Sequence, residues 1–178
     1  MMQKNSTRII RLTDAYSFKS FDCGVEDLNE FLLVDAKQYA KRLVSVTYII
    51  ENEDDIVAYF SLSNDKIAIP DSDKATWRKI KQVFPHSKHR SDYPAVKVGR
   101  LGVNKKYQGT HIGTDILDFV KTMFLTDSRT GCAFVTVDAL KCAIPFYLNN
   151  GFKFLDRGKI ESTDPTCPLY YDLSQLLS

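Results

Sequence analysis

The sequence predicts a mixed α/β (α+β) fold: a mixed, mostly antiparallel sheet of about six to seven strands, flanked by helices. Apolar residues recur at helical spacing over residues 28–43 and again over residues 112–124. Two β-rich runs, residues 44–51 and 56–63, are separated by the polar turn 52–55, which predicts an antiparallel hairpin. Helices mixed with a hairpin indicate a mixed sheet rather than a purely parallel one.

The other elements complete this pattern in chain order. A first strand is predicted at residues 8–12, and a fourth at residues 95–103 after the hairpin. Later strands are predicted at residues 132–139, 152–155 and 169–173. A short helix over residues 145–150 ends at Gly151, a residue type that often terminates helices. The apolar face of the first helix comprises Leu28, Phe31, Leu32, Ala36, Tyr39, Ala40 and Leu43.

Length and composition suit one compact domain over residues 1–178, large enough to bury a core. The chain is 44% hydrophobic and 26% charged, as in soluble globular proteins. The longest apolar run, around residues 44–50, is too short to cross a bilayer. The first residues lack an apolar stretch with a small-residue cleavage site, so no signal peptide is expected. These features predict a cytoplasmic protein without a membrane partner.

The cysteines give no sign of a metal site or a disulfide framework. No C-x-x-C pair occurs, and no cysteine stands at metal-ligand spacing from a histidine. Reduced thiols and no bound metal are therefore expected. The four cysteines are Cys23, Cys132, Cys142 and Cys167.

Charge is nearly balanced overall, with a net value of +2, but residues 74–90 are locally basic. This segment holds six Lys or Arg, two of the three histidines (His86 and His89) and no acid. It allows two interpretations. The basic and aromatic side chains could line an RNA backbone, or the segment could form an amphipathic helix. In the helix, which is the commoner case for a charge run, Trp77, Ile80, Val83 and Phe84 share one face, while Arg78, Lys79 and Lys81 face water.

Glycines concentrate between the fourth strand and the helix that follows it. Four of the eight glycines fall between residues 99 and 113. Backbone N–H groups of residues 109–114 would point out of the helix N-terminus, which suits an anion such as a diphosphate. The sequence contains neither G-x-x-x-x-G-K-[ST] nor G-x-G-x-x-G, so nucleotide-hydrolysing and dinucleotide folds are not expected. The alternative is an ordinary glycine-containing turn.

The stretch LGVNKKYQGTHIGTDIL (101–117) resembles the signature of the Gcn5-related N-acetyltransferases (GNAT). In that family a strand and a short basic turn precede Q/R-x-x-G-x-G/A at a helix start. Gln108, Ile112 and Gly113 fit, whereas His111 replaces the middle glycine. The His111 backbone N–H is retained, and its side chain must either point away from the cofactor or contact it. The resemblance implies a GNAT-like sheet splayed at the fourth strand, and acetyl-coenzyme A (acetyl-CoA) as cofactor. The implied cofactor-binding residues are Leu101, Gly102, Val103, Gln108, Gly109, Thr110, His111, Ile112, Gly113 and Thr114.

A second stretch, AIPFYLNNGFKF (143–154), resembles the late segment of the same family. The resemblance implies that Tyr147 is catalytic, lying near the thiol sulfur and acting as general acid. The alternative is that Phe146 and Tyr147 are core aromatics. Backbone N–H groups of residues 101–103 would serve the oxyanion and the pantetheine amides. No base is assigned: Asp138 is one candidate, but it could equally be a helix cap.

The N-terminal stretch FDCGVEDLNEFLLVDAKQYAK (21–41) is similar to a pattern of one bacterial GNAT branch. That branch includes toxins that acetylate the amino group of aminoacyl-tRNA, and it implies tRNA and a small antitoxin protein as partners. A net charge of +2 is lower than tRNA binding leads us to expect. Three hypotheses stay open: an N-acetyltransferase for a small-molecule or protein amine, a toxin acting on charged tRNA, and a non-catalytic CoA-binding domain. A homodimer is one candidate assembly.

Overall fold

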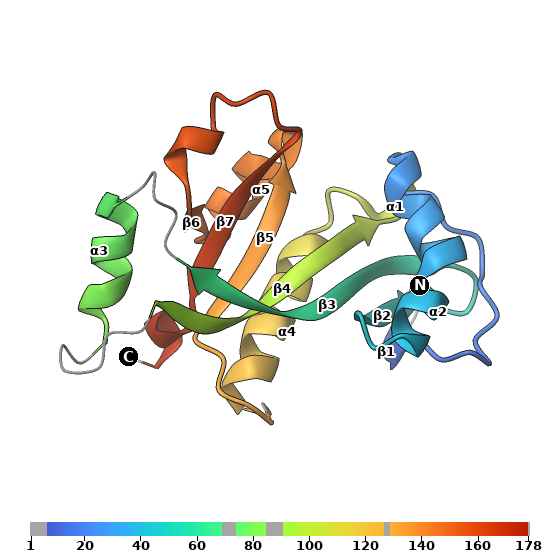
Figure 1. Cartoon of the computed structure of the whole chain (residues 1–178). Helices are drawn as coiled ribbons and strands as arrows, with labels where there is room; N and C mark the ends of the chain where they lie inside the picture. The colour runs from blue at the N-terminus through green and yellow to red at the C-terminus, as the bar shows by residue number, and fades with distance from the viewer. Residues whose placement is uncertain (1–6, 69–73, 85–90, 127–128, 178) are drawn as a thin grey trace. The chain divides into compact units, whose positions relative to one another are not determined.

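The computed structural model describes residues 7–68, 74–84, 91–126 and 129–177. Every strand expected from the sequence is present, and β3 and β4 are longer than expected (Figure 1). The strands are β1 (Arg8–Arg11), β2 (Val46–Glu51), β3 (Ile56–Ala68), β4 (Asp92–Val103), β5 (Phe134–Leu140), β6 (Lys153–Phe154) and β7 (Thr166–Asp172). The helices are α1 (Glu26–Glu30), the π-helical η1 (Phe31–Asp35), α2 (Ala36–Lys41), α3 (Lys74–Gln82), α4 (Ile112–Thr126) and α5 (Ile144–Asn149). Short 3₁₀ turns include η3 (Lys105–Tyr107) and η4 (Lys141–Ala143).

The strands form a seven-stranded sheet in the order β1-β2-β3-β4-β5-β7-β6. The pairs β1–β2, β2–β3, β5–β7 and β6–β7 are antiparallel, and β4–β5 is parallel. The mixed, mostly antiparallel sheet and the β2–β3 hairpin are therefore confirmed. The parallel register joins Ala95–Lys97 to Phe134–Thr136, and β4 then continues to Val103.

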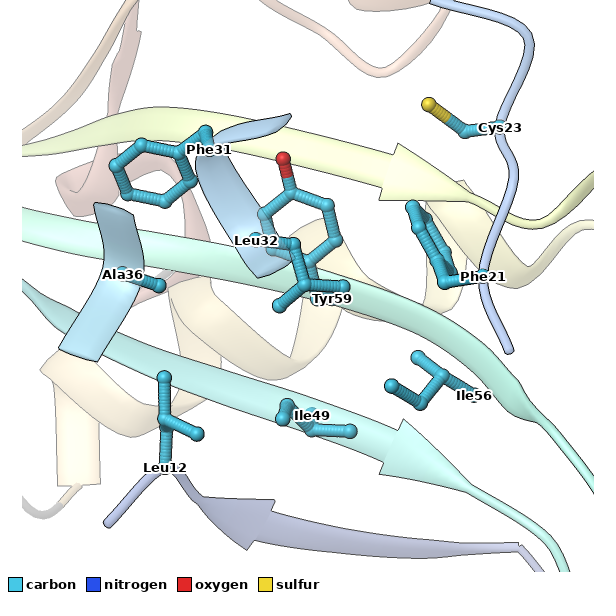
Figure 2. Packing of buried hydrophobic residues seen from close by; sticks show 9 residues of the cluster. All are labelled: Leu12, Phe21, Cys23, Phe31, Leu32, Ala36, Ile49, Ile56 and Tyr59. Atoms are coloured by element: carbon cyan, nitrogen blue, oxygen red, sulfur yellow. The ribbon is translucent and has the colours of Figure 1, made fainter. Parts of the chain in front are cut away.

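The chain divides into two compact units, which we describe separately. The first comprises residues 7–63 and 98–119, and the second comprises residues 64–97 and 120–177 within the described ranges. Tyr59 is fully buried in the core of the first unit (Figure 2). Its ring stacks on Phe31 and meets Phe21 edge-on, and its hydroxyl donates to the Leu28 carbonyl oxygen at 2.7 Å. The N-terminal stretch that resembles the bacterial branch thus packs around Tyr59, which belongs to β3.

The first predicted helix is one helical stretch, but its path differs from the regular pattern. The π-turn η1 inserts between α1 and α2 and shifts the helical register by one residue. Phe31, Leu32 and Ala36 are buried as expected. The assignment of Leu43 to the buried face is wrong, because α2 ends at Lys41 and Leu43 is 90% exposed with a φ of 57°.

In the second unit, α3 packs its apolar face on the core. Trp77 and Ile80 are buried with Tyr93 and Phe134, while Arg78 and Lys79 are exposed. The amphipathic-helix interpretation of this segment is therefore confirmed for its described part. Val83 is an exception: it lies beyond the end of α3 and is exposed, not buried. His86 and His89 lie outside the described residues.

Within the described ranges, none of the helices is long and apolar enough to span a lipid bilayer. The cysteines are free, with Cys23 and Cys167 buried and Cys142 exposed.

Candidate active site

The glycine-rich segment between β4 and α4 lies in the first unit and begins with the turn η3. Gln108 is extended, Gly109 has a φ of 77°, and His111 has a φ of 65°. Helix α4 begins at Ile112, and its first turn closes when the Asp115 N–H donates to the His111 carbonyl oxygen at 3.0 Å. Two left-handed residues therefore turn the chain into the helix.

The backbone N–H groups of residues 109–114 are free for a ligand. Those of residues 112–114 have no intrahelical acceptor, because they form the first turn of α4. Among the described residues, no hydrogen bond is donated by any of the N–H groups from 109 to 114. Such a row of donors at the positive end of a helix dipole fits a diphosphate. The loop therefore presents backbone donors that suit a phosphate-containing ligand.

His111, the residue that departs from the family pattern, adopts a left-handed backbone conformation. An L-residue other than glycine in the left-handed region is strained by about 1–2 kcal/mol. This position needs a positive φ, which is the physical reason that glycine suits it. The His111 side chain is exposed, so it does not displace the N–H groups around it.

A substitution series at His111 is expected to report this geometry. His111→Gly removes the steric strain but loosens the unfolded chain, so its stability should stay within about 1 kcal/mol of the wild type. His111→Val should lose about 1–3 kcal/mol, because a β-branched residue tolerates positive φ poorly. Urea unfolding of the three proteins measures this order. A His111→Val protein as stable as His111→Gly would contradict the left-handed conformation.

Two side chains brace the loop from within the first unit. The Gln108 amide nitrogen donates to the carbonyl oxygens of Cys23 and Val103, both at 2.9 Å. Thr110 Oγ1 donates to the Tyr107 carbonyl oxygen at 2.5 Å. Both residues were predicted to bind the cofactor, and in the structure these polar atoms contact the protein backbone. Binding of the cofactor by these two residues stays a prediction.

The end of β4, predicted to serve the oxyanion and the pantetheine, contains one sterically required glycine. A Cβ atom at Gly102 would lie 2.8 Å from Tyr59 Cε1 and 3.2 Å from Phe21 Cζ. Both rings belong to the core of the first unit, so they have little room to move. Leu101 and Val103 on either side are half-buried. Gly102 therefore lets the core rings approach the strand that is proposed to contact the cofactor.

Tyr147 belongs to α5 in the second unit. Its ring is only 6% exposed and meets Phe146 and Phe152 edge-on, at centroid distances of 5.0 and 5.4 Å. Burial raises the pKa of Tyr147 to about 12, so the phenol is protonated at neutral pH. Within the described residues its hydroxyl makes no hydrogen bond. The side chain therefore combines a packed ring with a protonated hydroxyl group that has no hydrogen-bond partner among the described residues.

The N-G-F turn after α5 depends on Lys121, a residue that the sequence analysis did not select. Lys121 is 6% exposed, donates to the Asn150 carbonyl oxygen at 3.2 Å, and lies 4.3 Å from the centroid of the Tyr171 ring. Gly151 has a φ of 83°, and a Cβ atom there would lie 3.0 Å from Tyr171 Cε2. Helical periodicity places Lys121 on α4 but does not show what its ammonium group contacts.

Asp138, the candidate base, has a cationic partner. Its carboxylate lies 2.5 Å from Lys97 Nζ, which joins β5 to β4. The helix-cap alternative is wrong, because Asp138 lies inside β5 and the N-cap residues of η4 and α5 are Leu140 and Ala143. The Asp138 carboxylate is therefore engaged by a neighbouring lysine within the sheet.

Residues 78–163 match the family model of the acetyltransferase (GNAT) domain. This matched range includes both the glycine-rich segment between β4 and α4 and Tyr147. The fold is also shared with solved structures over nearly the whole chain.

A variant of KacT is 26% identical, with a TM-score of 0.75 over 96% of this chain and 98% of that one. AtaT complexed with acetyl-methionyl-tRNAfMet is 20% identical, with a TM-score of 0.73 over 97% of this chain and 98% of that one. AtaTR bound with AcCoA is 21% identical, with a TM-score of 0.71 and the same coverage. The AtaT structures therefore share the fold of this chain.

Proposed function

We propose that the chain is a single acetyltransferase domain that uses acetyl-CoA to acetylate a primary amine by direct attack. The free N–H groups of residues 109–114 carry this proposal, because they form a ready site for the donor diphosphate. The donor, when bound, supplies an activated thioester. Its recognition at residues 101–103 and 108–114 is proposed from loop geometry and the family pattern together.

The transfer forms a C–N bond and breaks the C–S bond of the thioester. The attacking amine loses one proton, and the departing thiolate gains one. Tyr147 is proposed to donate the second proton, because it is neutral at physiological pH and is held in a fixed orientation by its aromatic neighbours. The Asp138–Lys97 ion pair favours a different route for the first proton, such as solvent water or an amine that arrives neutral.

For the acceptor, we propose the amino group of aminoacyl-tRNA. The similarity to KacT and AtaT extends over nearly the full length of both chains, and AtaT was solved with an acetylated aminoacyl-tRNA. The exposed cations Arg78 and Lys79 on α3 add a surface suited to a phosphate backbone. A small antitoxin protein is the corresponding protein partner, since the AtaT toxin was solved bound to AtaR. A small-molecule or protein amine is the second candidate acceptor.

The test is acetyl transfer by the purified chain from labelled acetyl-CoA to three acceptors: charged tRNA, a polyamine and a peptide with a free amino terminus. Acetylation of charged tRNA alone, weakening steeply with salt, is expected. Transfer to the polyamine or peptide with none to tRNA would replace the tRNA assignment. If calorimetry shows that acetyl-CoA binds but none of the amines is acetylated, the chain is a non-catalytic CoA-binding domain.

A further inference from the structure

The basic turn η3 stands between β4 and the diphosphate loop and contributes two adjacent lysines. Lys105 and Lys106 both have more than half of their side chain exposed. Next to a site for a polyanionic cofactor, such lysines would be expected to bind phosphate groups directly. Their contacts in the first unit point to a different role.

Lys105 is held by the N-terminal stretch. Its Nζ lies 2.8 Å from Asp22 Oδ2, and its backbone N–H donates to the Asp22 carbonyl oxygen at 2.8 Å. The other Asp22 oxygen accepts from the Asn29 side chain and the Gly24 N–H. Gly24 has a φ of 86°, and a Cβ atom there would lie 2.9 Å from Lys105 Cε. Residues 22–24 of the N-terminal stretch are therefore joined to this lysine by backbone and side-chain contacts.

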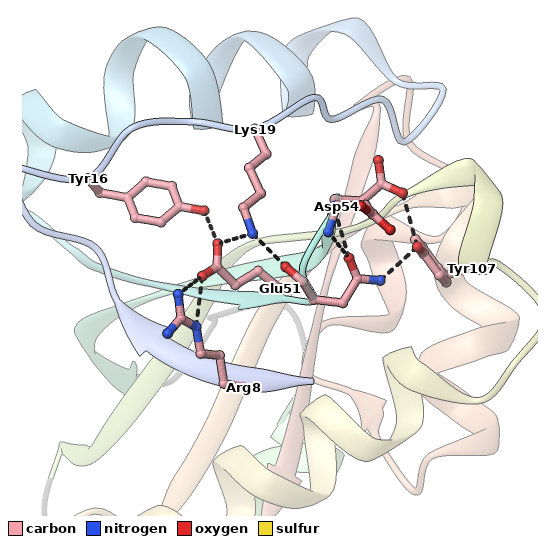
Figure 3. Close-up of polar contacts among 8 residues, drawn as sticks. Arg8, Tyr16, Lys19, Glu51, Asp54 and Tyr107 are labelled. Carbon is pink, nitrogen blue, oxygen red and sulfur yellow. Dashed lines mark hydrogen bonds and ion pairs between the residues drawn. The ribbon is translucent and has the colours of Figure 1, made fainter. Parts of the chain in front are cut away.

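Lys106 is held by the β2–β3 turn. Its Nζ contacts both oxygens of Asp55, at 2.9 and 3.0 Å. The Tyr107 hydroxyl donates to Asp55 Oδ2 at 3.0 Å and accepts from the Asn52 side-chain amide at 2.8 Å (Figure 3). Asn52 Oδ1 in turn accepts the backbone N–H groups of Asp54 and Asp55. The side chains of Asp55, Tyr107 and Asn52 thus form one chain of hydrogen bonds, which connects the basic turn to the hairpin.

Asn104, the residue before the basic turn, fixes its start. Asn104 is 4% exposed, and its backbone N–H and side-chain amide donate to the carbonyl oxygens of Val57 and Ile56. Its Oδ1 accepts the Lys106 N–H at 3.1 Å. The basic turn is therefore attached to β3, to the hairpin and to the N-terminal stretch.

Both aspartates are ionised partners of the lysines. The hydrogen bond from Lys105, with those from Asn29 and Gly24, lowers the pKa of Asp22 to about 2. The hydrogen bond from Lys106 holds the pKa of Asp55 below its usual range, and that of Lys106 above it. Each lysine charge thus faces a carboxylate in the same unit.

We propose that Asp55 and Asp22 are positioning residues for the diphosphate-binding backbone. Lys105 and Lys106 act in this arrangement as tethers of the basic turn and not as ligands of the cofactor phosphates. The inference rests on the proposed binding of acetyl-CoA at residues 109–114. In this arrangement the backbone N–H groups contact the phosphates. The carboxylates of Asp22 and Asp55, from distant parts of the chain, hold that backbone in place.

The two roles predict opposite effects of Asp55→Asn. If Lys106 binds phosphate, removing the competing carboxylate frees the lysine and strengthens acetyl-CoA binding. If Lys106 is a tether, the same substitution loosens the turn and weakens binding. Asp54→Asn is the matched control, because it removes the same charge from the neighbouring, exposed position. Lys106→Met breaks the same ion pair from its exposed end and provides a second variant if Asp55→Asn folds poorly.

The experiment is calorimetric titration of acetyl-CoA into each variant, with urea unfolding and steady-state kinetics alongside. We expect Asp55→Asn and Lys106→Met each to raise Kd and KM for acetyl-CoA by about tenfold, with kcat at saturation unchanged. The double variant should bind no more weakly than either single variant. Asp54→Asn should stay within about twofold of the wild type, and Asp22→Asn should change in the same direction as Asp55→Asn.

Tighter or unchanged binding by Asp55→Asn would overturn the inference, as would additive losses in the double variant. A fall in kcat that parallels the loss of unfolding free energy would mean that Asp55 is merely structural. Failure of the wild-type chain to bind acetyl-CoA would refute the proposed function itself. If the wild-type chain binds acetyl-CoA and Asp55→Asn leaves the Kd unchanged, only the positioning role is refuted.

Discussion

Replacing Tyr147 with phenylalanine is expected to lower kcat for acetyl transfer by about 100-fold or more. The Kd of acetyl-CoA should change by less than about threefold, because the lost proton serves the transition state and not the bound donor. The ring contacts with Phe146 and Phe152 survive this change, so the fold should persist. Single-turnover kinetics and calorimetry measure the two quantities separately.

Tyr93→Phe is the matched control for this variant. Tyr93 is 3% exposed in the same unit, and its hydroxyl is buried without a partner among the described residues. Removing that hydroxyl should leave kcat unchanged. If Tyr147→Phe lowers kcat and cofactor affinity equally, or lowers neither, then Tyr147 is a core aromatic and not the general acid.

Replacing Glu51 with glutamine is expected to destabilise the fold by about 2–3 kcal/mol. Glu51 is 1% exposed and accepts hydrogen bonds from Arg8 at 2.6 and 2.9 Å and from Tyr16 at 2.5 Å (Figure 3). Lys19 Nζ lies 3.4 Å away. An amide keeps the shape but loses the charge that these donors surround. Thermal unfolding should show a Tm lower by about 5–10 °C.

The loss at Glu51 should depend on pH. Burial raises the pKa of Glu51, but the hydrogen bonds from Tyr16 and Arg8 and the charge of Lys19 outweigh burial, and the pKa stays below its usual range. The ionised carboxylate therefore stabilises the fold above the unfolded-state pKa of about 4.3, and this contribution is lost as pH falls through the lower folded-state pKa. The stability difference between the wild type and Glu51→Gln should shrink below about pH 4.3.

Glu53→Gln makes the same chemical change at an exposed position of the same hairpin. Its stability curve should follow that of the wild type at every pH. A difference between the wild type and Glu51→Gln that is small, or constant down to pH 2, would show that the carboxylate is not bound as described.

The sequence predicted the elements well where apolar spacing reports one buried face. The hairpin, α4 and the strand after it follow from local periodicity, and the buried face of α3 was assigned correctly at Trp77 and Ile80. The assignment of Leu43 to the buried face was wrong because α2 ends at Lys41, before Leu43, and the spacing of apolar residues does not mark that end.

For the loop at residues 109–114, too, the sequence predicted some features and only the structure revealed others. Its spacing predicted a row of N–H donors, and the structure leaves those groups without partners among the described residues. The departure at His111 was visible in the sequence, but its left-handed backbone was not. Lys121 was missed because the ring and the carbonyl that it contacts lie far along the chain.

By itself, the sequence determined which segments form helices and strands, and where a helix start offers its N–H groups to an anion. These properties depend on neighbours within one or two turns of the chain. Only the tertiary structure decided that the lysines of the basic turn face Asp22 and Asp55, which lie 83 and 51 residues away. Such partners are set by strand register and by packing of distant segments, which local spacing does not encode.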